Sequence, residues 1–239
     1  MNDLDLILPV YNPSKNWAEV IVESINKIKE LRPELKISVI VINDGSDKNV
    51  SDEQMQYLSK NIERFVYHNH RKNHGKGAAI RSGLEFCSSR VIIYTDADFP
   101  YAEEYIPMMY DKVINEKCNI VIAVRDDQYD RSATASRKFL STLIQRMNKI
   151  LLNLPHADSQ AGLKAFDQMG AGLLAETRID GFLFDLEMLV LAGNTSEINV
   201  GKFPVKLKDS VVLSKFKTSL LIKELLNYMK IVFRVWISK

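Results

Sequence analysis

The sequence lacks the features that mark several large classes of protein. The spacing of its two cysteines, Cys87 and Cys118, fits neither a metal site nor a redox pair, so we expect buried thiols in a reducing compartment such as the cytoplasm. The net charge is only +2, which argues against nucleic acid as a partner. No apolar stretch reaches the roughly 18 uncharged residues of a membrane-spanning helix. Asp3 and Asp5 interrupt any apolar run of the kind found in a signal peptide.

What the sequence does contain is an ordinary globular composition. The chain has 239 residues, of which 46% are hydrophobic and 26% charged, enough for a sizeable core. It has no internal repeat and no low-complexity segment. We therefore expect one large domain with an appendage, with the domain at residues 1–214 and an amphipathic, basic helix at residues 215–239.

The chain is organised around an apolar run that ends in two aspartates. Residues 91–95 are short, continuous and rich in β-branched side chains, which is typical of a strand buried in a parallel sheet. Asp96 and Asp98 follow directly, so their carboxylates are expected at the edge where open α/β sheets bind ligands. Carboxylates suit Mg²⁺ or Mn²⁺, which usually bridge to phosphates. Surface turns also carry Asp-x-Asp, so the pair alone is a weak signal.

Strand and helix patterns alternate along the first half of the chain. Apolar runs predict strands at 4–10, 37–42, 65–67, 91–95 and 119–124. Periodic patterns between them predict helices near 15–31, 75–86 and 102–116, the first with Ser14 as its N-cap. This alternation predicts an α/β fold with a doubly wound parallel sheet. The loops after the first, second and central strands should then meet at one edge of the sheet.

The second half of the chain is less regular. Residues 125–137 are polar, with three arginines and three aspartates. The patterns that follow predict a long helix at about 132–154, a loop at 158–162, a helix at 185–192, an extended segment at 198–213 and a helical tail.

Four short motifs follow successive strands, namely Pro9-Val-Tyr-Asn12, Asn43-Asp-Gly-Ser46, Gly75-Lys-Gly77 and Asp96-Ala-Asp98. Each motif is weak alone, but together they resemble the inverting nucleotide-sugar glycosyltransferases of family 2, which have the GT-A fold. Later motifs resemble the polyprenyl-phosphate glycosyltransferases, nearest to the dolichyl-phosphate glucosyl- and mannosyltransferases. These later motifs are Arg125, Arg137 with Ser141, DSQAGLK at 158–164 and FDLE at 184–187. The resemblance covers roughly residues 4–215.

The resemblance implies a nucleotide-sugar donor, of the UDP-glucose or GDP-mannose type. Asp44 would accept hydrogen bonds from the base or ribose, against Pro9 and Tyr11. Lys76 would add positive charge between two glycines that let the backbone approach a ligand closely. The spacing of a P-loop is absent. The implied donor set is Pro9, Tyr11, Asp44, Lys76, Gly77, Asp96, Ala97, Asp98, Lys208 and Lys215, with Lys206 a further candidate.

The resemblance also implies that Asp96 and Asp98 hold Mg²⁺ or Mn²⁺ on the donor diphosphate, where the metal offsets charge on the leaving group. Two prolines depart from the family pattern. Pro100 stands where relatives often carry a further polar ligand, and Pro13 where many carry glutamate. A third protein ligand for the metal is therefore in doubt.

The implied acceptor is a polyprenyl or dolichyl phosphate. Arg125 and Arg137 would bind its phosphate, with a further hydrogen bond from Ser141, and the two arginines join Asp96 and Asp98 as the implied catalytic residues. A phosphate oxygen is already ionised at neutral pH, so no strong general base is required. Catalysis would then rest on positioning and charge stabilisation. Asp185 and Glu187 lie in the acidic helix motif of the family, and we give a structural role for them the same weight as direct catalysis.

Other readings of the same motifs remain open. A family 2 enzyme with a saccharide acceptor would need a carboxylate base rather than paired arginines. A sugar-phosphate nucleotidyltransferase would need a glycine-rich loop after the first strand, where this chain has Pro9-Val-Tyr-Asn12. A non-catalytic binding module would not need both aspartates and both arginines. Three histidines at 68, 70 and 74 suggest zinc only weakly, because no cysteine or carboxylate supports them.

The tail has the pattern of an amphipathic helix. On a helical wheel, Lys223, Asn227, Lys230 and Arg234 form a narrow polar strip, opposite a wide apolar face that carries Leu221, Leu225, Leu226, Tyr228, Met229, Val232, Phe233 and Trp236. We expect this helix to lie in a membrane interface, at the cytoplasmic face, and to anchor the enzyme peripherally. The alternatives are packing on the domain's own core or a dimer seam, and a homo-oligomer stays open.

Overall fold

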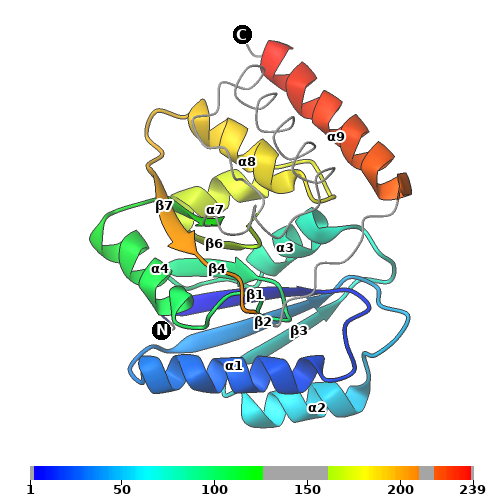
Figure 1. Cartoon of the computed structure of the whole chain (residues 1–239), viewed down its shortest axis with the longest axis vertical. Helices are drawn as coiled ribbons and strands as arrows, with labels where there is room; N and C mark the ends of the chain where they lie inside the picture. Colours follow the sequence, from blue (N-terminus) through cyan, green and yellow to red (C-terminus); the bar gives the residue numbers. More distant parts are fainter. Residues whose placement is uncertain (1–2, 126–160, 210–217, 238–239) are drawn as a thin grey trace.

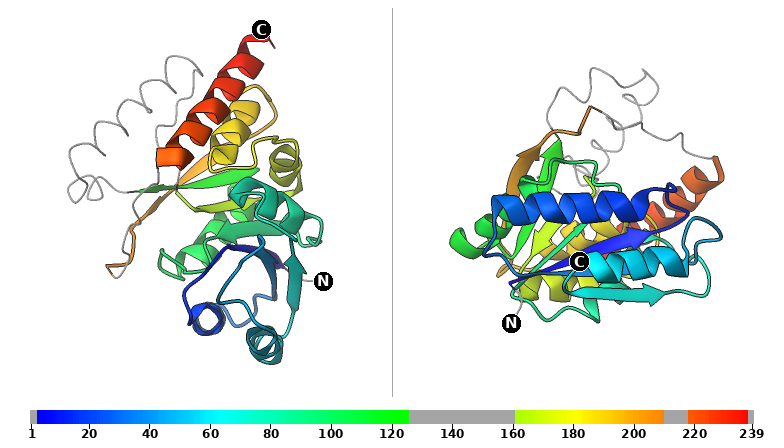
Figure 2. Two further views of the ribbon diagram at one scale, coloured as in Figure 1. Left: turned by 90° about the vertical axis from the view of Figure 1, so that its right-hand side faces the viewer. Right: turned by 90° about the horizontal axis from the view of Figure 1, so that it is seen from below.

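Seven strands form one sheet in the computed structural model, which describes residues 3–125, 161–209 and 218–237 (Figures 1 and 2). The strands lie in the order β3-β2-β1-β4-β6-β5-β7. All neighbours are parallel except β6, which is antiparallel to β4 and β5. The strands are β1 (Leu4–Val10), β2 (Ile37–Asn43), β3 (Phe65–Asn69), β4 (Val91–Thr95), β5 (Ile120–Arg125), β6 (Leu163–Phe166) and β7 (Val200–Val205). The mostly parallel sheet predicted for the GT-A fold is confirmed.

Helices cover both faces of this sheet, as Figure 2 shows. One layer contains α1 (Trp17–Leu31), α2 (Asp52–Asn61) and α4 (Tyr105–Asn115). The other contains α3 (Lys76–Leu84), α7 (Gln168–Ala175), α8 (Phe184–Gly193) and α9 (Thr218–Ile237).

Strand β2 shows how the sequence builds the two layers. Its seven residues are all buried, which explains the continuous apolar run. Val39 and Val41 belong to the core beneath α1, whereas Ile40 and Ile42 belong to the core beneath α3 and α8. Successive side chains of a strand point to opposite faces, so a strand between two helical layers is apolar throughout.

The start of α1 differs from the prediction. Its N-cap is Asn16, without a side-chain hydrogen bond to the backbone, and Ser14 was the wrong choice. The first helical residue is Trp17, which is buried and donates from its indole nitrogen to the carbonyl oxygen of Asn49 at 2.7 Å. Burial of this ring, rather than a local cap, sets where the helix begins.

Strand β6 is the main correction to the predicted topology. It enters between β4 and β5 with the opposite direction, and the sequence patterns predicted no strand there. Its four residues are all buried, so it has no alternation between apolar and polar side chains to mark it as a strand. Helix α7, which follows directly, was also missed. The helix predicted at 132–154 lies outside the described residues.

Helix α9 packs on the domain in an orientation that only partly matches the predicted wheel. Tyr228 and Ile231 are buried in the core beside α8, and Asn227 from the polar strip is also buried. Four large apolar side chains point away from the domain and are 57–67% exposed, namely Leu225, Leu226, Met229 and Phe233. We call these four the outer face of α9. No helix in the described parts of the chain has both the length and the hydrophobicity to cross a bilayer.

Candidate active site

The predicted site residues that the structure describes gather at one edge of the sheet. The parallel strands β1, β2, β4, β5 and β7 all end there, which brings together the segments that carry Tyr11, Asp44, Asp96 and Lys208. Because β6 is antiparallel, its amino end and the preceding Gly162 reach the same edge. The expected convergence of the loops after β1, β2 and β4 is confirmed.

Asp96 and Asp98 lie in a tight turn at the end of β4. The amide of Phe99 donates to the carbonyl oxygen of Asp96 at 3.0 Å, and Phe99 has a φ of +44°, a left-handed conformation that is costly for an aromatic residue. Its ring is buried, so core packing holds this turn in place. As a result, Asp98 is exposed, and the Asp96 side chain is 38% exposed.

The charges around the two aspartates are unbalanced. Lys76, at the start of α3, pairs with Asp96 through its ammonium group. Burial, the largest single effect, would lower the pKa of Lys76, but the nearby carboxylates, chiefly Asp96 with Asp185 and Asp98, raise it on balance. Although the Asp98 residue is exposed, the surrounding protein partly desolvates its carboxyl group, which raises the pKa of Asp98, and the negative charge of Asp96 raises it further. Asp98 therefore lies in a place where a further cation is favourable.

This electrostatic setting fits a divalent metal. Two accessible carboxylates with mutual repulsion are suitable hard oxygen ligands for Mg²⁺ or Mn²⁺. Within the described ranges, no group of three or more histidine, cysteine or acidic side chains is arranged to hold a metal ion. Asp96 and Asp98 would thus hold it together with water and phosphate oxygens.

Groups of the protein itself occupy the hydrogen-bond acceptor positions of the Asp44 carboxylate. Its carboxylate accepts hydrogen bonds from the backbone amides of His74 and Gly75, at 2.9 and 2.8 Å. It also lies 2.8 Å from His70 Nδ1 and 2.9 Å from Asn73 Nδ2. A carboxylate has about four acceptor positions, so a nucleobase can bind Asp44 only if one of these donors moves. In this structure Asp44 orders the loop that leads to Lys76.

The two glycines that flank Lys76 allow a close approach of the protein itself. Gly75 has a φ of +118°, and a side chain at Gly75 or Gly77 would collide with the backbone at Ile179 and Asp180. The carbonyl oxygen of Asp180 accepts a hydrogen bond from the amide of Gly77 at 2.8 Å. In this structure they let the loop at residues 178–183, called the capping loop below, contact the start of α3, and the predicted approach of a ligand to Gly77 stays a prediction.

A buried ionic network lies beneath the site and was not predicted. Lys164 of β6 is fully buried, 3.0 Å from Asp185 Oδ2, and donates to the carbonyl oxygen of Ala161 at 2.9 Å. Tyr94 of β4 donates its hydroxyl hydrogen to Asp185. Burial raises the pKa of Asp185, against the opposing effects of Lys164 and Tyr94. Lys164 and Asp185 lie in two motifs of the sequence, DSQAGLK and FDLE, but nothing in the sequence paired them.

This network also affects the position of Asp96. A side chain at Gly162 would collide with the Asp96 carboxylate. Since Lys164 holds the neighbouring Ala161, the network fixes the backbone against which Asp96 rests. In this structure the Asp185 carboxylate is occupied by Lys164 and Tyr94, which supports the structural reading of this residue.

Lys208 reaches the same edge from the segment after β7. Its amide donates to the carbonyl oxygen of Pro100 at 2.9 Å, which ties it to the aspartate turn. Its ammonium lies 3.0 Å from Glu103 Oε1. Burial, the largest single effect, would raise the pKa of Glu103, but the hydrogen bond and charge of Lys208, together with hydrogen bonds from the backbone and Ser24, lower it on balance. Lys208 is therefore paired, although its charge still acts on Asp98.

The remaining predicted residues are placed only in part. Tyr11 is 51% exposed just after β1, and Pro9 is half-buried at the end of that strand. Ala97 is buried within the aspartate turn. The backbone of Arg125 ends β5 at the site edge, but its side chain is outside the description. Arg137, Ser141 and Lys215 lie outside the described residues.

Glu187, the second acid of the FDLE motif, holds the capping loop. Its carboxylate accepts hydrogen bonds from the amides of Arg178 and Ile179, at 2.7 and 2.8 Å, and pairs with Arg234 of α9. Glu224 of α9 accepts from the amides of Phe182 and Leu183, at 3.3 and 3.2 Å. The loop that caps α3 is therefore fixed by acids from both α8 and α9.

Comparisons with known proteins agree with this architecture. A family model described as Glycosyl transferase family 2 matches residues 5–170. The chain is 27% identical over 241 residues to the dolichyl-phosphate beta-glucosyltransferase ALG5A of Trichomonas vaginalis, covering 95% of this chain and 72% of that protein.

Solved structures share the fold at low sequence identity. One is glucosyl-3-phosphoglycerate synthase from Mycobacterium tuberculosis with Mn²⁺, UDP and glucosyl-3-phosphoglycerate, with a TM-score of 0.60 and 16% identity over 99% of this chain and 79% of that one. Another is the mannosyltransferase PcManGT from Pyrobaculum calidifontis with GDP-Man and Mn²⁺, with a TM-score of 0.61 and 18% identity over 100% of this chain and 67% of that one.

Proposed function

The chain belongs to glycosyl transferase family 2, and from that premise we propose that it moves a hexose from a nucleotide sugar to a polyprenyl or dolichyl phosphate, with inversion at the sugar carbon. The observation that carries the proposal is the accessible Asp96–Asp98 turn beside Lys76, at the ligand-binding edge of the sheet. The similarity to a dolichyl-phosphate beta-glucosyltransferase along 95% of the chain supports the lipid acceptor.

On the donor side, the nucleotide would lie across the ends of β1 and β2, with its diphosphate at Asp96 and Asp98. Tyr11 is exposed there and offers a ring against which a base can stack. Lys76 and Lys208 bring positive charge toward the diphosphate, and Lys215 is a further candidate. Asp44 contributes chiefly by ordering the loop before Lys76.

We propose that the enzyme depends on Mg²⁺ or Mn²⁺ held by Asp96 and Asp98. When bound, the metal supplies Lewis-acid stabilisation of the charge on the leaving nucleoside diphosphate. The raised pKa of Asp98, which reflects partial desolvation of its carboxyl group and the neighbouring Asp96 charge, supports this assignment because a cation there relieves the repulsion. The complexes of two neighbours with Mn²⁺ support the same view.

On the acceptor side, the lipid phosphate would be held by Arg125, Arg137 and Ser141. The backbone of Arg125 ends β5 at the same edge as Asp96, which favours such a contact. The phosphate oxygen is the nucleophile and is already ionised near neutral pH. The protein therefore has to align this oxygen and stabilise charge, rather than remove a proton.

We also propose that residues 1–214 make up the catalytic domain and that residues 215–239 bring it to a membrane surface. The outer face of α9 supports this assignment, because large apolar side chains are rarely left in water on one helix face without a partner. Such a helix would hold the enzyme where lipid phosphates are found.

A transfer assay tests the proposed function directly. The purified chain is incubated with Mn²⁺, labelled UDP-glucose or GDP-mannose, and a short-chain polyprenyl phosphate in detergent micelles. We expect label in the lipid fraction, and none when EDTA is in excess. A parallel reaction with free saccharides covers the alternative acceptor class. Transfer to a saccharide without transfer to the lipid phosphate would overturn the proposal.

A further inference from the structure

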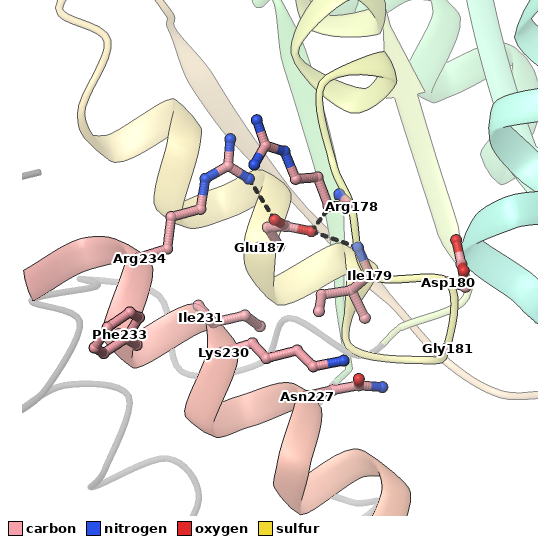
Figure 3. Close-up of a pocket in the computed structure, with 10 residues that line it drawn as sticks. All are labelled: Arg178, Ile179, Asp180, Gly181, Glu187, Asn227, Lys230, Ile231, Phe233 and Arg234. Carbon is pink, nitrogen blue, oxygen red and sulfur yellow. Dashed lines mark hydrogen bonds and ion pairs between the residues drawn. The ribbon is translucent and has the colours of Figure 1, made fainter. Parts of the chain in front are cut away.

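A cavity of about 540 Å³ lies between the capping loop, α8 and α9 (Figure 3). It is not part of the Asp96–Asp98 site, because the capping loop contacts the start of α3 on its other side. Arg178 enters the cavity wall from the capping loop, whereas Lys230 and Arg234 come from α9. No residue predicted for the donor or acceptor lines it.

The charges in this cavity are not balanced. Of its two acids, Asp180 pairs with Arg81 of α3 and Glu187 pairs with Arg234. Glu187 also accepts two backbone hydrogen bonds, so its carboxylate has little capacity left. Arg178 and Lys230 are exposed and have no acidic partner among the described residues. In Figure 3 the Arg178 guanidinium points toward that of Arg234 rather than toward the Lys230 ammonium, so the cavity offers a positive group at each end. Such ends favour anionic ligands, and arginine suits phosphate in particular.

The cavity is continuous with the outer face of α9. Phe233 both lines the cavity and belongs to that face, with 67% of its surface exposed. On a helix with 3.6 residues per turn, Lys230 falls between the buried side at Asn227 and the apolar side at Phe233 and Leu226. In Figure 3 the Lys230 ammonium points toward the capping loop at Gly181. A polar cavity thus borders an apolar surface along one edge of the helix.

This combination matches a molecule with an anionic head and an apolar body. We propose that the cavity binds the phosphate headgroups of anionic membrane lipids, through Arg178 at one end and Lys230 at the other, with the acyl chains against the outer face of α9. The inference rests on the proposed function, because it presumes that α9 meets a membrane. A free phosphate would leave Phe233, Met229 and Leu226 in water, so a bilayer lipid is the ligand that uses both surfaces.

The test is binding to vesicles, measured by flotation. One set of vesicles contains only phosphatidylcholine, and the other also contains phosphatidylglycerol. The variant R178Q/K230Q removes two charges from the cavity, and its fold should survive because both side chains are exposed. The matched control K36Q/K60Q removes two charges from exposed residues at the start of β2 and the end of α2. Thermal unfolding of all three proteins checks that the variants are folded.

We expect R178Q/K230Q to bind the anionic vesicles about 30-fold more weakly than the unaltered protein, since each basic residue near an anionic surface contributes about 1 kcal/mol. The control should bind the anionic vesicles as the unaltered protein does. If both double variants bind equally, the cavity is not the headgroup site. If soluble glycerol phosphate binds the unaltered protein in buffer as tightly as the anionic vesicles do, the apolar face adds nothing, the ligand is a free phosphate ester and the lipid assignment is wrong.

The proposed function can fail separately from this inference. Transfer by the unaltered protein in detergent micelles, with no vesicles present, reports the enzymatic activity alone. A protein that binds anionic vesicles through Arg178 and Lys230 but transfers no sugar would retain the lipid site and lose the proposed function. If the unaltered protein transfers sugar but both double variants bind vesicles equally, the proposed function stands and the lipid site is excluded.

Discussion

Asp96 and Asp98 are one residue apart but have different surroundings. Asp96 pairs with Lys76 and rests against Gly162, whereas Asp98 is exposed and has no ion pair among the described residues. Asp96 is therefore held by the protein, and Asp98 offers the more available ligand. This asymmetry makes Asp98 the sharper position for a test.

We predict that Asp98→Ala abolishes turnover while the protein stays folded. The side chain is exposed, so its loss should change the free energy of unfolding by no more than about 0.5 kcal/mol. Thermal unfolding and the transfer assay measure the two effects, and excess EDTA should abolish turnover of the unaltered protein as well. Full activity in EDTA would refute the metal assignment for Asp96 and Asp98.

The buried pair of Lys164 and Asp185 allows a second prediction at this scale. Lys164→Met leaves the Asp185 charge buried without its partner, so we expect unfolding to become easier by about 3–5 kcal/mol. The double variant Lys164→Met/Asp185→Leu removes both charges and should recover much of that loss. Urea unfolding measures both. Equal stability of the single variant and the unaltered protein would show that the pair does not hold the core beneath Asp96.

The acceptor arginines give a third residue-level prediction. Arg125→Ala and Arg137→Ala should each weaken use of the polyprenyl phosphate, because a lost charge-assisted hydrogen bond costs roughly 1.5–3 kcal/mol. Donor binding, measured by nucleotide titration, should change little. Arg131→Ala is the matched control from the same polar segment and should transfer sugar normally. An equal loss of donor affinity would assign the altered arginine to the donor side.

At the scale of elements, the sequence predicted best where local pattern and burial agree. The parallel strands and the helices between them were found because their apolar periods are regular. Asp96 and Asp98 followed from the topology, because they end a strand at the ligand-binding edge, whereas Lys76 and Lys208 were named from the family resemblance. Strand β6 could not be found, because an antiparallel strand of four buried residues has no period and contains a lysine.

The contacts of Asp44, Gly75 and Gly77 could not be predicted either, for a different reason. Their motifs are short and match a ligand-binding role, but the groups that contact these residues come from distant segments of the chain. Asp44 binds residues about 30 positions away, and Gly75 meets Asp180 more than 100 positions away. A single sequence does not reveal such pairings.

The capping loop contacts both α9 and α3, and a substitution of Glu224 tests whether this contact affects the site. The Glu224 carboxylate accepts from the amides of Phe182 and Leu183, the latter being the N-cap of α8, where a negative charge is favourable. We predict that Glu224→Ala lowers the free energy of unfolding by about 1–3 kcal/mol and weakens nucleotide binding through the loop. Glu176→Ala, an exposed acid at the end of α7, is the control and should change neither quantity. Unaltered nucleotide affinity in Glu224→Ala would mean that the loop carries no coupling.

At the scale of the whole molecule, the rise in Tm on nucleotide binding should show which nucleotide the donor carries. Ligands that bind only the folded state stabilise it, by about 2.7 kcal/mol at 100 times their dissociation constant. For a chain of this length, that corresponds to about 5–10 °C in Tm. We predict that UDP with Mn²⁺ raises Tm by this amount and that GDP with Mn²⁺ raises it less. This choice follows the DSQ segment at 158–160 and the glucosyltransferase relative. The opposite order would indicate a mannosyl donor.

The outer face of α9 also determines whether the purified protein associates with itself in solution. Leu225, Leu226, Met229 and Phe233 form one surface, and two copies in plain buffer can hide it most easily against each other. Particle size in detergent-free solution should therefore grow with concentration and ionic strength, as for a weak surfactant. Adding a mild detergent above its micelle threshold should return single chains. Apparent oligomers measured without detergent would then describe this helix rather than an assembly of the catalytic domain.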